Sequence, residues 1–207
     1  CSTAVGYLNP IKNRQNLKTI TNAHVKKINF KGKTAIGIEY WQGDELKKLT
    51  CDKEIILSSG SIGSPQILQT SGIGNSQNLK NLGIDVVQEL KGVGENLQDH
   101  LMFRPIYKIQ GLKSLNKKIN SLFGKLMIGL EYIFNRSGPM TMGASQVCGF
   151  LKSDSSKATP NLQFHVQPIS TDILGATKMH DFDGITPTVA NIRPTSRGEI
   201  NITSNDS

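Results

Sequence analysis

Cysteine is scarce in this sequence, with only Cys1, Cys51 and Cys148 among 207 residues. Three widely separated thiols cannot build a disulfide scaffold, and none of them forms a Cys-x-x-Cys pair, so we expect no metal site. Long apolar runs are also missing. Because about 20 consecutive apolar residues are needed to cross a bilayer, we expect no membrane-spanning segment.

Acidic residues are outnumbered: 16 Asp and Glu stand against 24 Lys and Arg, which gives a formal net charge of +8. The lysines are scattered, mostly in pairs such as Lys26-Lys27, and there is no arginine-rich arm, zinc-finger spacing or alternation of aromatic and basic residues. We therefore interpret the charge as a solvated basic surface and expect no nucleic-acid partner. A domain that binds polyanions is the alternative that the charge leaves open.

The composition otherwise fits a folded protein, since 37% of the residues are hydrophobic and 19% charged. Residues 16–30 alternate between apolar and polar in two registers, which predicts a strand with a β-bulge near Lys26-Lys27. A turn at residues 31–33 leads into a returning strand at 34–41, and residues 46–51 can pair back onto it. The first part of the chain is therefore expected to be a β-meander.

A connection from strand to helix follows at residues 54–74, EIILSSGSIGSPQILQTSGIG. The apolar run at 55–57 predicts a strand buried on both faces, and the glycines after it allow a tight turn. Ser64 is suited to cap a helix that begins at Pro65, and Gly72 is suited to end it. Such a helix N-terminus directs free backbone N–H groups at one spot, which favours an anion such as phosphate. An ordinary tight connection explains the same residues.

The rest of the chain predicts alternating elements. Residues 75–83 favour a short helix, 84–90 an extended segment, and 92–100 a polar loop with two glycines. Apolar residues spaced by three and four predict a helix over residues 115–134 that packs its apolar stripe on the core. Strands are predicted at residues 161–167, 188–192 and 199–203, and a boundary between two units near residues 102–107. From the residues alone, we expect a nucleotide-binding α/β protein.

Residues 60–74, GSIGSPQILQTSGIG, resemble the second signature of the glucose–methanol–choline (GMC) flavin oxidoreductases over its whole length. Further blocks resemble the same family in the same order: NLKTITNAHVKKINF at 16–30, GVGENLQDH at 92–100, SGPMT at 137–141 and RPTSRGEI at 193–200. Together with QFHVQP at 163–168, the combination is most similar to the insect glucose dehydrogenase branch. The resemblance covers almost the whole chain and is weakest at residues 108–125.

The resemblance implies an α/β fold, in which part of an FAD-binding Rossmann-like domain is followed by part of an antiparallel-sheet substrate domain. The first part would be residues 1–104 and the second residues 105–207, both incomplete, so that the chain is an internal fragment. In this family the glycine-rich pyrophosphate fingerprint and the catalytic histidine belong to segments nearer the two termini. The resemblance therefore assigns no catalytic residue here, and neither His100 nor His165 is promoted to that role; the fragment alone is expected to be inactive.

For the cofactor FAD, the resemblance implies four contact residues. The strand through Val25 would lie against the adenine end and use its backbone, while Ser59 and Gly60 would lie close to the ADP part. Ser59 replaces an alanine that is usual in the family. Asn96 would lie near the flavin side, although its loop can also be explained as one tied down by its own Asn and Asp side chains.

The implied activity is hydride transfer from the CH–OH group of a small-molecule alcohol or sugar to flavin, followed by electron transfer to a quinone-like acceptor. Two alternatives stay open: an oxidase that passes the electrons to oxygen, and a catalytically inactive binding protein with the same fold. Asn-x-Ser/Thr triplets at Asn135, Asn201 and Asn205, together with the insect resemblance, favour secretion.

Overall fold

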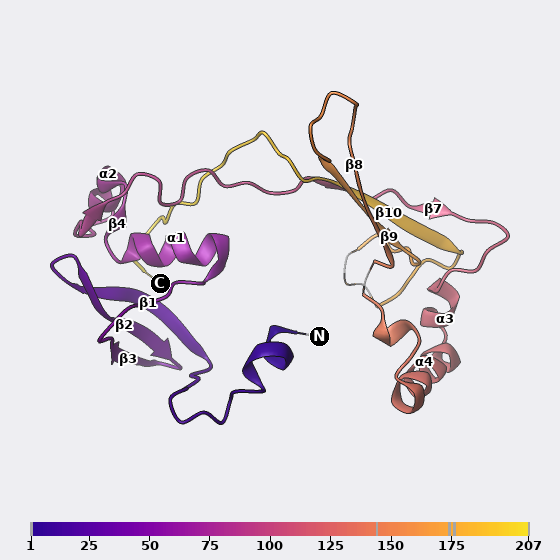
Figure 1. The fold of residues 1–207 in the computed structure, drawn as a ribbon, viewed down its shortest axis with the longest axis horizontal. Helices are drawn as coiled ribbons and strands as arrows, with labels where there is room; N and C mark the ends of the chain where they lie inside the picture. Colours follow the sequence, from indigo (N-terminus) through magenta and orange to yellow (C-terminus); the bar gives the residue numbers. More distant parts are fainter. Residues whose placement is uncertain (1, 144, 174, 176, 207) are drawn as a thin grey trace. The chain divides into compact units, whose positions relative to one another are not determined.

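The computed structural model describes residues 2–143, 145–173, 175 and 177–206 (Figure 1); Cys1, and Ser207 of the last Asn-x-Ser triplet, lie outside them. The chain divides into two compact units, one made of Cys1–Leu97 with Arg197–Ser207 and the other of Gln98–Ser196. The sequence predicted that residues 105–207 all belong to the second part, whereas in the structure residues 197–207 belong to the first unit. That the two units are an FAD-binding and a substrate domain stays a prediction.

The first unit contains the predicted meander. Strands β1 (Ala23–Lys31), β2 (Thr34–Gln42) and β3 (Glu45–Thr50) form an antiparallel sheet in that order. The pairing passes from Val25–Tyr40 directly to Lys27–Glu39. The extra residue is Lys26, so the predicted bulge is confirmed.

Helix α1 (Gly60–Thr70) starts earlier than predicted, because Ser59 and not Ser64 is its N-cap residue. Ser64 lies inside the helix, where its Oγ accepts a hydrogen bond from the Ser59 N–H at 3.0 Å. Pro65 is also inside α1 and does not open it. The predicted end is confirmed, since Gly72 follows the C-cap Ser71 with a φ of +84°.

Residues 55–57 were expected to form a buried strand, and this prediction is wrong for the described structure. No strand pairs with them among the described residues, and the Ile56 side chain is 79% exposed. An apolar run becomes a strand only when a neighbouring strand satisfies its backbone groups.

Short elements complete the first unit. A π-helical turn, η1 (Ala4–Leu8), precedes the sheet, and β4 (Ile73–Gly74) pairs in parallel with β5 (Gln88–Glu89). The predicted short helix is α2 (Ser76–Asn81), whose N-cap Asn75 accepts hydrogen bonds from two backbone N–H groups. The extended segment predicted at 84–90 is a strand only at β5.

The second unit is built on an antiparallel sheet. Its strands lie in the order β6 (Met102–Phe103), β10 (Gly184–Asn191), β9 (Leu162–Gln167) and β8 (Val147–Leu151), and β7 (Tyr107–Lys108) also pairs with β10. This confirms the strands predicted near 161–167 and 188–192. The strand predicted at 199–203 is not formed; only an isolated bridge joins Leu97 to Gly198 in that region.

The predicted helix over residues 115–134 is broken in two. Helix α3 (Asn116–Asn120) ends at Ser121, which is extended with a ψ of 134° and caps α4 (Leu122–Asn135) by accepting the Gly124 N–H. A short 3-10 turn, η2 (Pro139–Thr141), follows. The chain therefore changes direction at Ser121, where a serine hydroxyl can cap a new helix.

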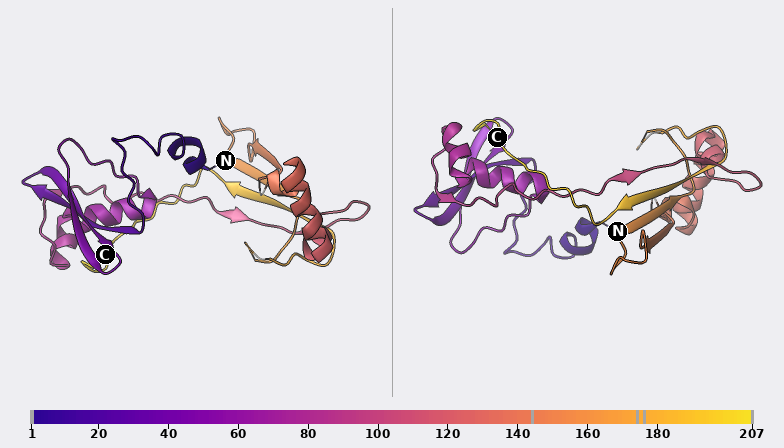
Figure 2. Two further views of the ribbon diagram at one scale, coloured as in Figure 1. Left: turned by 90° about the horizontal axis from the view of Figure 1, so that it is seen from below. Right: turned by 90° about the horizontal axis from the view of Figure 1, so that it is seen from above.

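The sequence predicted that the apolar stripe of α4 packs on the core, but the structure leaves much of that stripe exposed. Leu122, Leu126 and Ile133 are 85%, 58% and 63% exposed, whereas the side of the helix that carries Ile128 is buried. Figure 2 shows α4 as the long helix of this unit. Within the described residues, no helix has the length and apolar character to cross a membrane.

Candidate functional site

A cavity of about 260 Å³ lies between β1 and α1 in the first unit. Val25 and Ser59, which are 34 residues apart in the sequence, both line it. The complete lining is Ala23, His24, Val25, Lys26, Ser59, Gly63, Gln66, Ile67 and Thr70. The strand thus contributes one wall, and α1, from its N-cap Ser59 to its last residue Thr70, contributes the other.

The N-terminus of α1 opens beside this cavity. Ser59 makes no side-chain cap, and the first turn contains no acidic residue. Its backbone N–H groups and the helix dipole therefore make the end of the helix favourable for an anion.

Gly60 has a φ of +79°, and a Cβ added there would meet no atom within 4 Å. Glycine is therefore required by the backbone conformation, while the space beside it is open.

Asn96 lies apart from the other predicted cofactor residues. It is exposed, has a left-handed φ of +62°, and does not line this cavity. Its loop is held by backbone hydrogen bonds to residues 198–200: Leu97 and Gly198 bond each other in both directions at 2.8 Å, and the Ile200 N–H donates to the Gly94 carbonyl at 2.7 Å. The structure thus brings Val25 and Ser59 together in one cavity lining, whereas Gly60 follows Ser59 without lining the cavity and Asn96 lies apart. The cofactor contacts of all four stay predictions.

Sequence analysis missed part of the lining. Ser59, Gly63, Gln66, Ile67 and Thr70 follow the helical spacing of three and four residues, so they share one face of α1. That spacing was a signal that could have found Gly63 and Gln66. Ala23 is two residues before Val25 and shares its face by strand alternation, so it too could have been found, whereas His24 is on the other face and carried no such signal.

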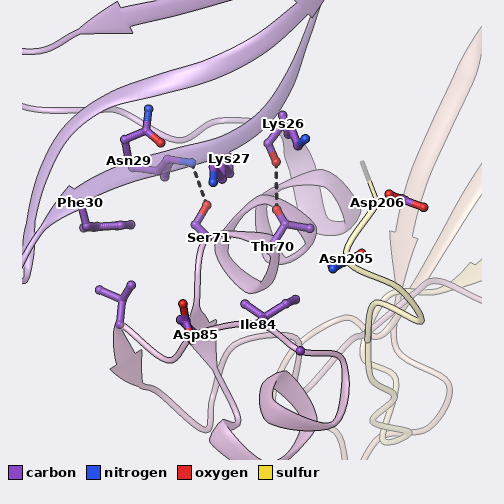
Figure 3. A pocket seen from close by; sticks show the side chains of 13 residues that line it. Lys26, Lys27, Asn29, Phe30, Thr70, Ser71, Ile84, Asp85, Asn205 and Asp206 are labelled. Carbon is purple, nitrogen blue, oxygen red and sulfur yellow. Dashed lines mark hydrogen bonds between the residues drawn. The ribbon is translucent and has the colours of Figure 1, made fainter. Parts of the chain in front are cut away.

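A larger cavity of about 560 Å³ lies at the other end of α1, and sequence analysis did not predict it (Figure 3). It is lined by Lys26, Lys27, Ile28, Asn29, Phe30, Thr70, Ser71, Gly83, Ile84, Asp85, Val87, Asn205 and Asp206. Two hydrogen bonds bind the free edge of β1 to the helix here: the Ile28 N–H donates to Ser71 Oγ at 2.8 Å, and Thr70 Oγ1 donates to the Lys26 carbonyl at 3.0 Å.

The two lysines at the bulge have different surroundings. Lys27 Nζ lies 3.8 Å from Glu39 Oε2, and Lys48 Nζ lies 3.0 Å from the other carboxylate oxygen, Oε1. The hydrogen bond from Lys48 is the main reason that the pKa of Glu39 is lowered, and the charge of Lys27 adds to it, while desolvation acts in the opposite direction. Lys26 Nζ instead lies 5.4 Å from the centre of the Trp41 ring. Glu39 therefore compensates the charge of Lys27, and Lys26 is held by cation–π attraction.

A Ser-His-Asp arrangement occurs in the second unit. His180 Nδ1 lies 3.1 Å from Ser170 Oγ, and His180 Nε2 lies 3.2 Å from Asp172 Oδ1. Ser170 is fully buried, and its Oγ already accepts a hydrogen bond from Asn116 Nδ2 at 2.8 Å. A nucleophile must reach its substrate, so this cluster is structural.

The histidines are not part of a metal centre within the described ranges. No group of three His, Cys, Asp or Glu side chains there could hold a metal ion. His24 alone among the histidines lines the smaller cavity.

Comparison with known proteins identifies a protein family that the chain matches. Residues 1–102 match the family model described as GMC oxidoreductase. An oxygen-dependent choline dehydrogenase of Serratia proteamaculans is 40% identical over 209 residues, which cover 99% of this chain and 37% of that protein. Another from Chromohalobacter salexigens is 42% identical over 207 residues, covering 99% of this chain and 36% of that protein. The chain thus spans a little over a third of the length of the curated relatives it matches.

Solved structures show the same fold at low identity. A formate oxidase from Aspergillus oryzae superposes with a TM-score of 0.83 at 22% identity, over 95% of this chain and 39% of that one. A pyridoxine 4-oxidase from Mesorbium loti superposes with a TM-score of 0.74 at 20% identity, over 99% of this chain and 36% of that one. The predicted α/β fold class is confirmed, while the insect glucose dehydrogenase branch stays a prediction.

Proposed function

Because this chain belongs to the GMC oxidoreductase family, we propose that it is part of an FAD-dependent enzyme that oxidises the CH–OH group of a small alcohol. The curated relatives are named choline dehydrogenases, which supports an alcohol as substrate. Since the chain spans about a third of those relatives, we place the base that takes the hydroxyl proton outside it. The role of this chain is to bind and orient the cofactor.

The observation that carries the proposal is the cavity between β1 and α1 that Val25 and the helix N-cap Ser59 both line. At about 260 Å³ it is smaller than the roughly 300–1,000 Å³ of a typical ligand pocket, so it fits one end of a dinucleotide and not the whole. Small residues, Ala23, Ser59 and Gly63, leave room for a flat ring, and the free N–H groups of α1 suit a neighbouring phosphate. FAD, when bound, supplies the hydride acceptor.

We propose a small alcohol as substrate and compare two electron acceptors, oxygen and a quinone. The names of the relatives make choline the first alcohol to test, with a sugar such as glucose as the candidate from the sequence resemblance. The same names, oxygen-dependent choline dehydrogenases, support oxygen beside a quinone among the acceptors to compare.

The test uses the longer protein that contains this chain. We expect it to be purified yellow, with flavin absorbance that bleaches when choline, another alcohol or a sugar is added without oxygen. Reoxidation by oxygen or by a quinone then identifies the acceptor. A protein that retains FAD but is reduced by none of these substrates is the inactive relative, and a protein without FAD contradicts the proposal.

A further inference from the structure

Gln69 has an unusual environment for a polar residue near the end of a surface helix. Its side chain is only 5% exposed. Its Nε2 donates to the Ile200 carbonyl at 2.8 Å, and its Oε1 accepts the Ile202 N–H at 3.0 Å. One amide group therefore satisfies two backbone groups of residues 200–202, as a neighbouring strand would. This explains why the strand predicted at residues 199–203 has no strand partner in the described part of the chain.

The segment held by Gln69 in turn holds the loop that carries Asn96. The Ile200 N–H donates to the Gly94 carbonyl at 2.7 Å, and Gly198 and Leu97 exchange two hydrogen bonds of 2.8 Å. Asn96 lies between these anchored positions, with its left-handed φ of +62°. Ile200 is thus bonded to Gln69 through its carbonyl and to Gly94 through its N–H.

The packing around this contact leaves no room for adjustment. A Cβ added to Gly94 would overlap the Ile200 carbonyl oxygen and lie 2.7 Å from Gln69 Nε2. A Cβ at Gly74 would lie 3.3 Å from Gln69 Cγ. Gln69, Gly94 and Ile200 therefore form one tightly packed contact, which we call the Gln69 clamp.

We propose that Gln69 is a positioning residue for the cofactor: through the Gln69 clamp, it sets the place of the Asn96 loop relative to α1. This inference rests on the proposed function, because it assumes that the N-terminus of α1 and Asn96 both face FAD. One helix then serves both contacts: one of its faces, from Ser59 to Thr70, lines the small cavity, and Gln69 in its last turn holds the loop.

The experiment compares variants of the full-length, FAD-loaded protein. Gln69→Leu keeps the bulk of the side chain but leaves the Ile200 carbonyl and the Ile202 N–H without their partner. We expect FAD release on dilution to accelerate by about tenfold, since one unsatisfied buried group has an effect of this order, and the visible circular dichroism of the flavin to change. Gln69→Glu keeps an acceptor for the Ile202 N–H but directs a carboxylate oxygen at the Ile200 carbonyl, so it is expected to change the flavin signal at least as much as Gln69→Leu.

Two further variants separate positioning from general stability. Gly94→Ala disturbs the same clamp from the other side, so it should reproduce the flavin signal of Gln69→Leu, and the double variant should add little. Ile128→Ala removes a side chain of α4 that is 8% exposed in the second unit, so it lowers the melting temperature and leaves the flavin spectrum unchanged.

The outcomes discriminate between the two proposals. If the wild type holds FAD and Gln69→Leu melts at a lower temperature with unchanged flavin dichroism and FAD release, Gln69 is only structural and the inference is overturned. If the wild type holds no FAD, the proposed function is contradicted, and the inference about Gln69, which depends on it, is overturned as well.

Discussion

Single residues decide the local geometry at the N-terminus of α1. Gly60 adopts a φ of +79°, and the open space beside it would accept a methyl group without collision. The cost of a larger residue is therefore conformational, about 1–2 kcal/mol for a non-glycine residue in this region. The same holds for Gly43, with a φ of +61° in the turn between β2 and β3.

This pair gives a matched prediction. Gly60→Ala and Gly43→Ala should lower the free energy of unfolding by similar amounts. Only Gly60→Ala should weaken FAD binding, by about tenfold, because relief of the strain moves the first turn of α1. Unfolding in urea and titration of the apoprotein with FAD measure the two effects. Equal FAD affinity in both variants would contradict the proposed site.

The carboxylate of Glu39 provides a prediction on pH. The hydrogen bond from Lys48 lowers its pKa below the ordinary value of 4.5. A lowered pKa in the folded state means that Glu39 contributes its stability fully above about pH 4.5 and loses it as the pH falls through the lowered value. Glu39→Gln should therefore be less stable than the wild type at neutral pH.

This difference should shrink as the pH falls below 4.5, the ordinary value for this side chain. The free energy of unfolding of both proteins, measured from neutral to acidic pH, tests it. A difference that stays constant over that range would show that the charge of Glu39 is not the cause.

At the scale of elements, α4 shows that the formation of a helix can be predicted from the sequence while the face that it buries cannot. Its apolar residues follow helical spacing, so the helix itself is predicted from the sequence. The structure buries the face with Gly124 and Ile128 and leaves Leu126 and Ile133 exposed. Gly124 is essential to that arrangement, because a Cβ there would overlap the Lys118 carbonyl of α3.

Two glycines of α4 therefore respond in opposite directions to the same substitution. Gly129→Ala meets no atom within 4 Å and should stabilise the protein by about 1 kcal/mol through higher helix propensity. Gly124→Ala should destabilise it by about 1–3 kcal/mol, because α3 and α4 must move apart. Thermal unfolding distinguishes them, and stabilisation by both would mean that the contact between α3 and α4 is not formed.

At the scale of the whole molecule, the contacts separate into two units, Cys1–Leu97 with Arg197–Ser207 and Gln98–Ser196. We predict that a substitution in the core of one unit destabilises mainly that unit. Leu79→Ala should cost about 2–5 kcal/mol and increase hydrogen exchange in β1–β3 and α1, while β9 and β10 stay protected.

The reciprocal variant is Ile128→Ala, which removes a side chain that is 8% exposed in the second unit. It should increase exchange there and spare β1–β3. Hydrogen exchange followed by mass spectrometry resolves the two regions, and an equal loss of protection in both units after either substitution would show that they unfold as one.

The sequence by itself determined the elements whose signals are local. Alternation and turn residues predicted the meander and the bulge at Lys26, and spacing predicted α2 and most of α4. The motif at residues 60–74 also indicated the family that the comparisons show. These features depend on neighbours a few residues apart, which the sequence displays directly.

Only the tertiary structure decided the features that need distant partners. The run at 55–57 pairs with no strand in the part of the chain that the structure describes, and backbone groups of Ile200 and Ile202 bond the side chain of Gln69 instead of a strand. The exposed stripe of α4 and the joining of Val25 with Ser59 in one cavity likewise depend on which surfaces meet. Backbone hydrogen bonds and apolar faces must find partners somewhere, but the sequence does not state where, because partner choice depends on contacts between residues far apart in the chain.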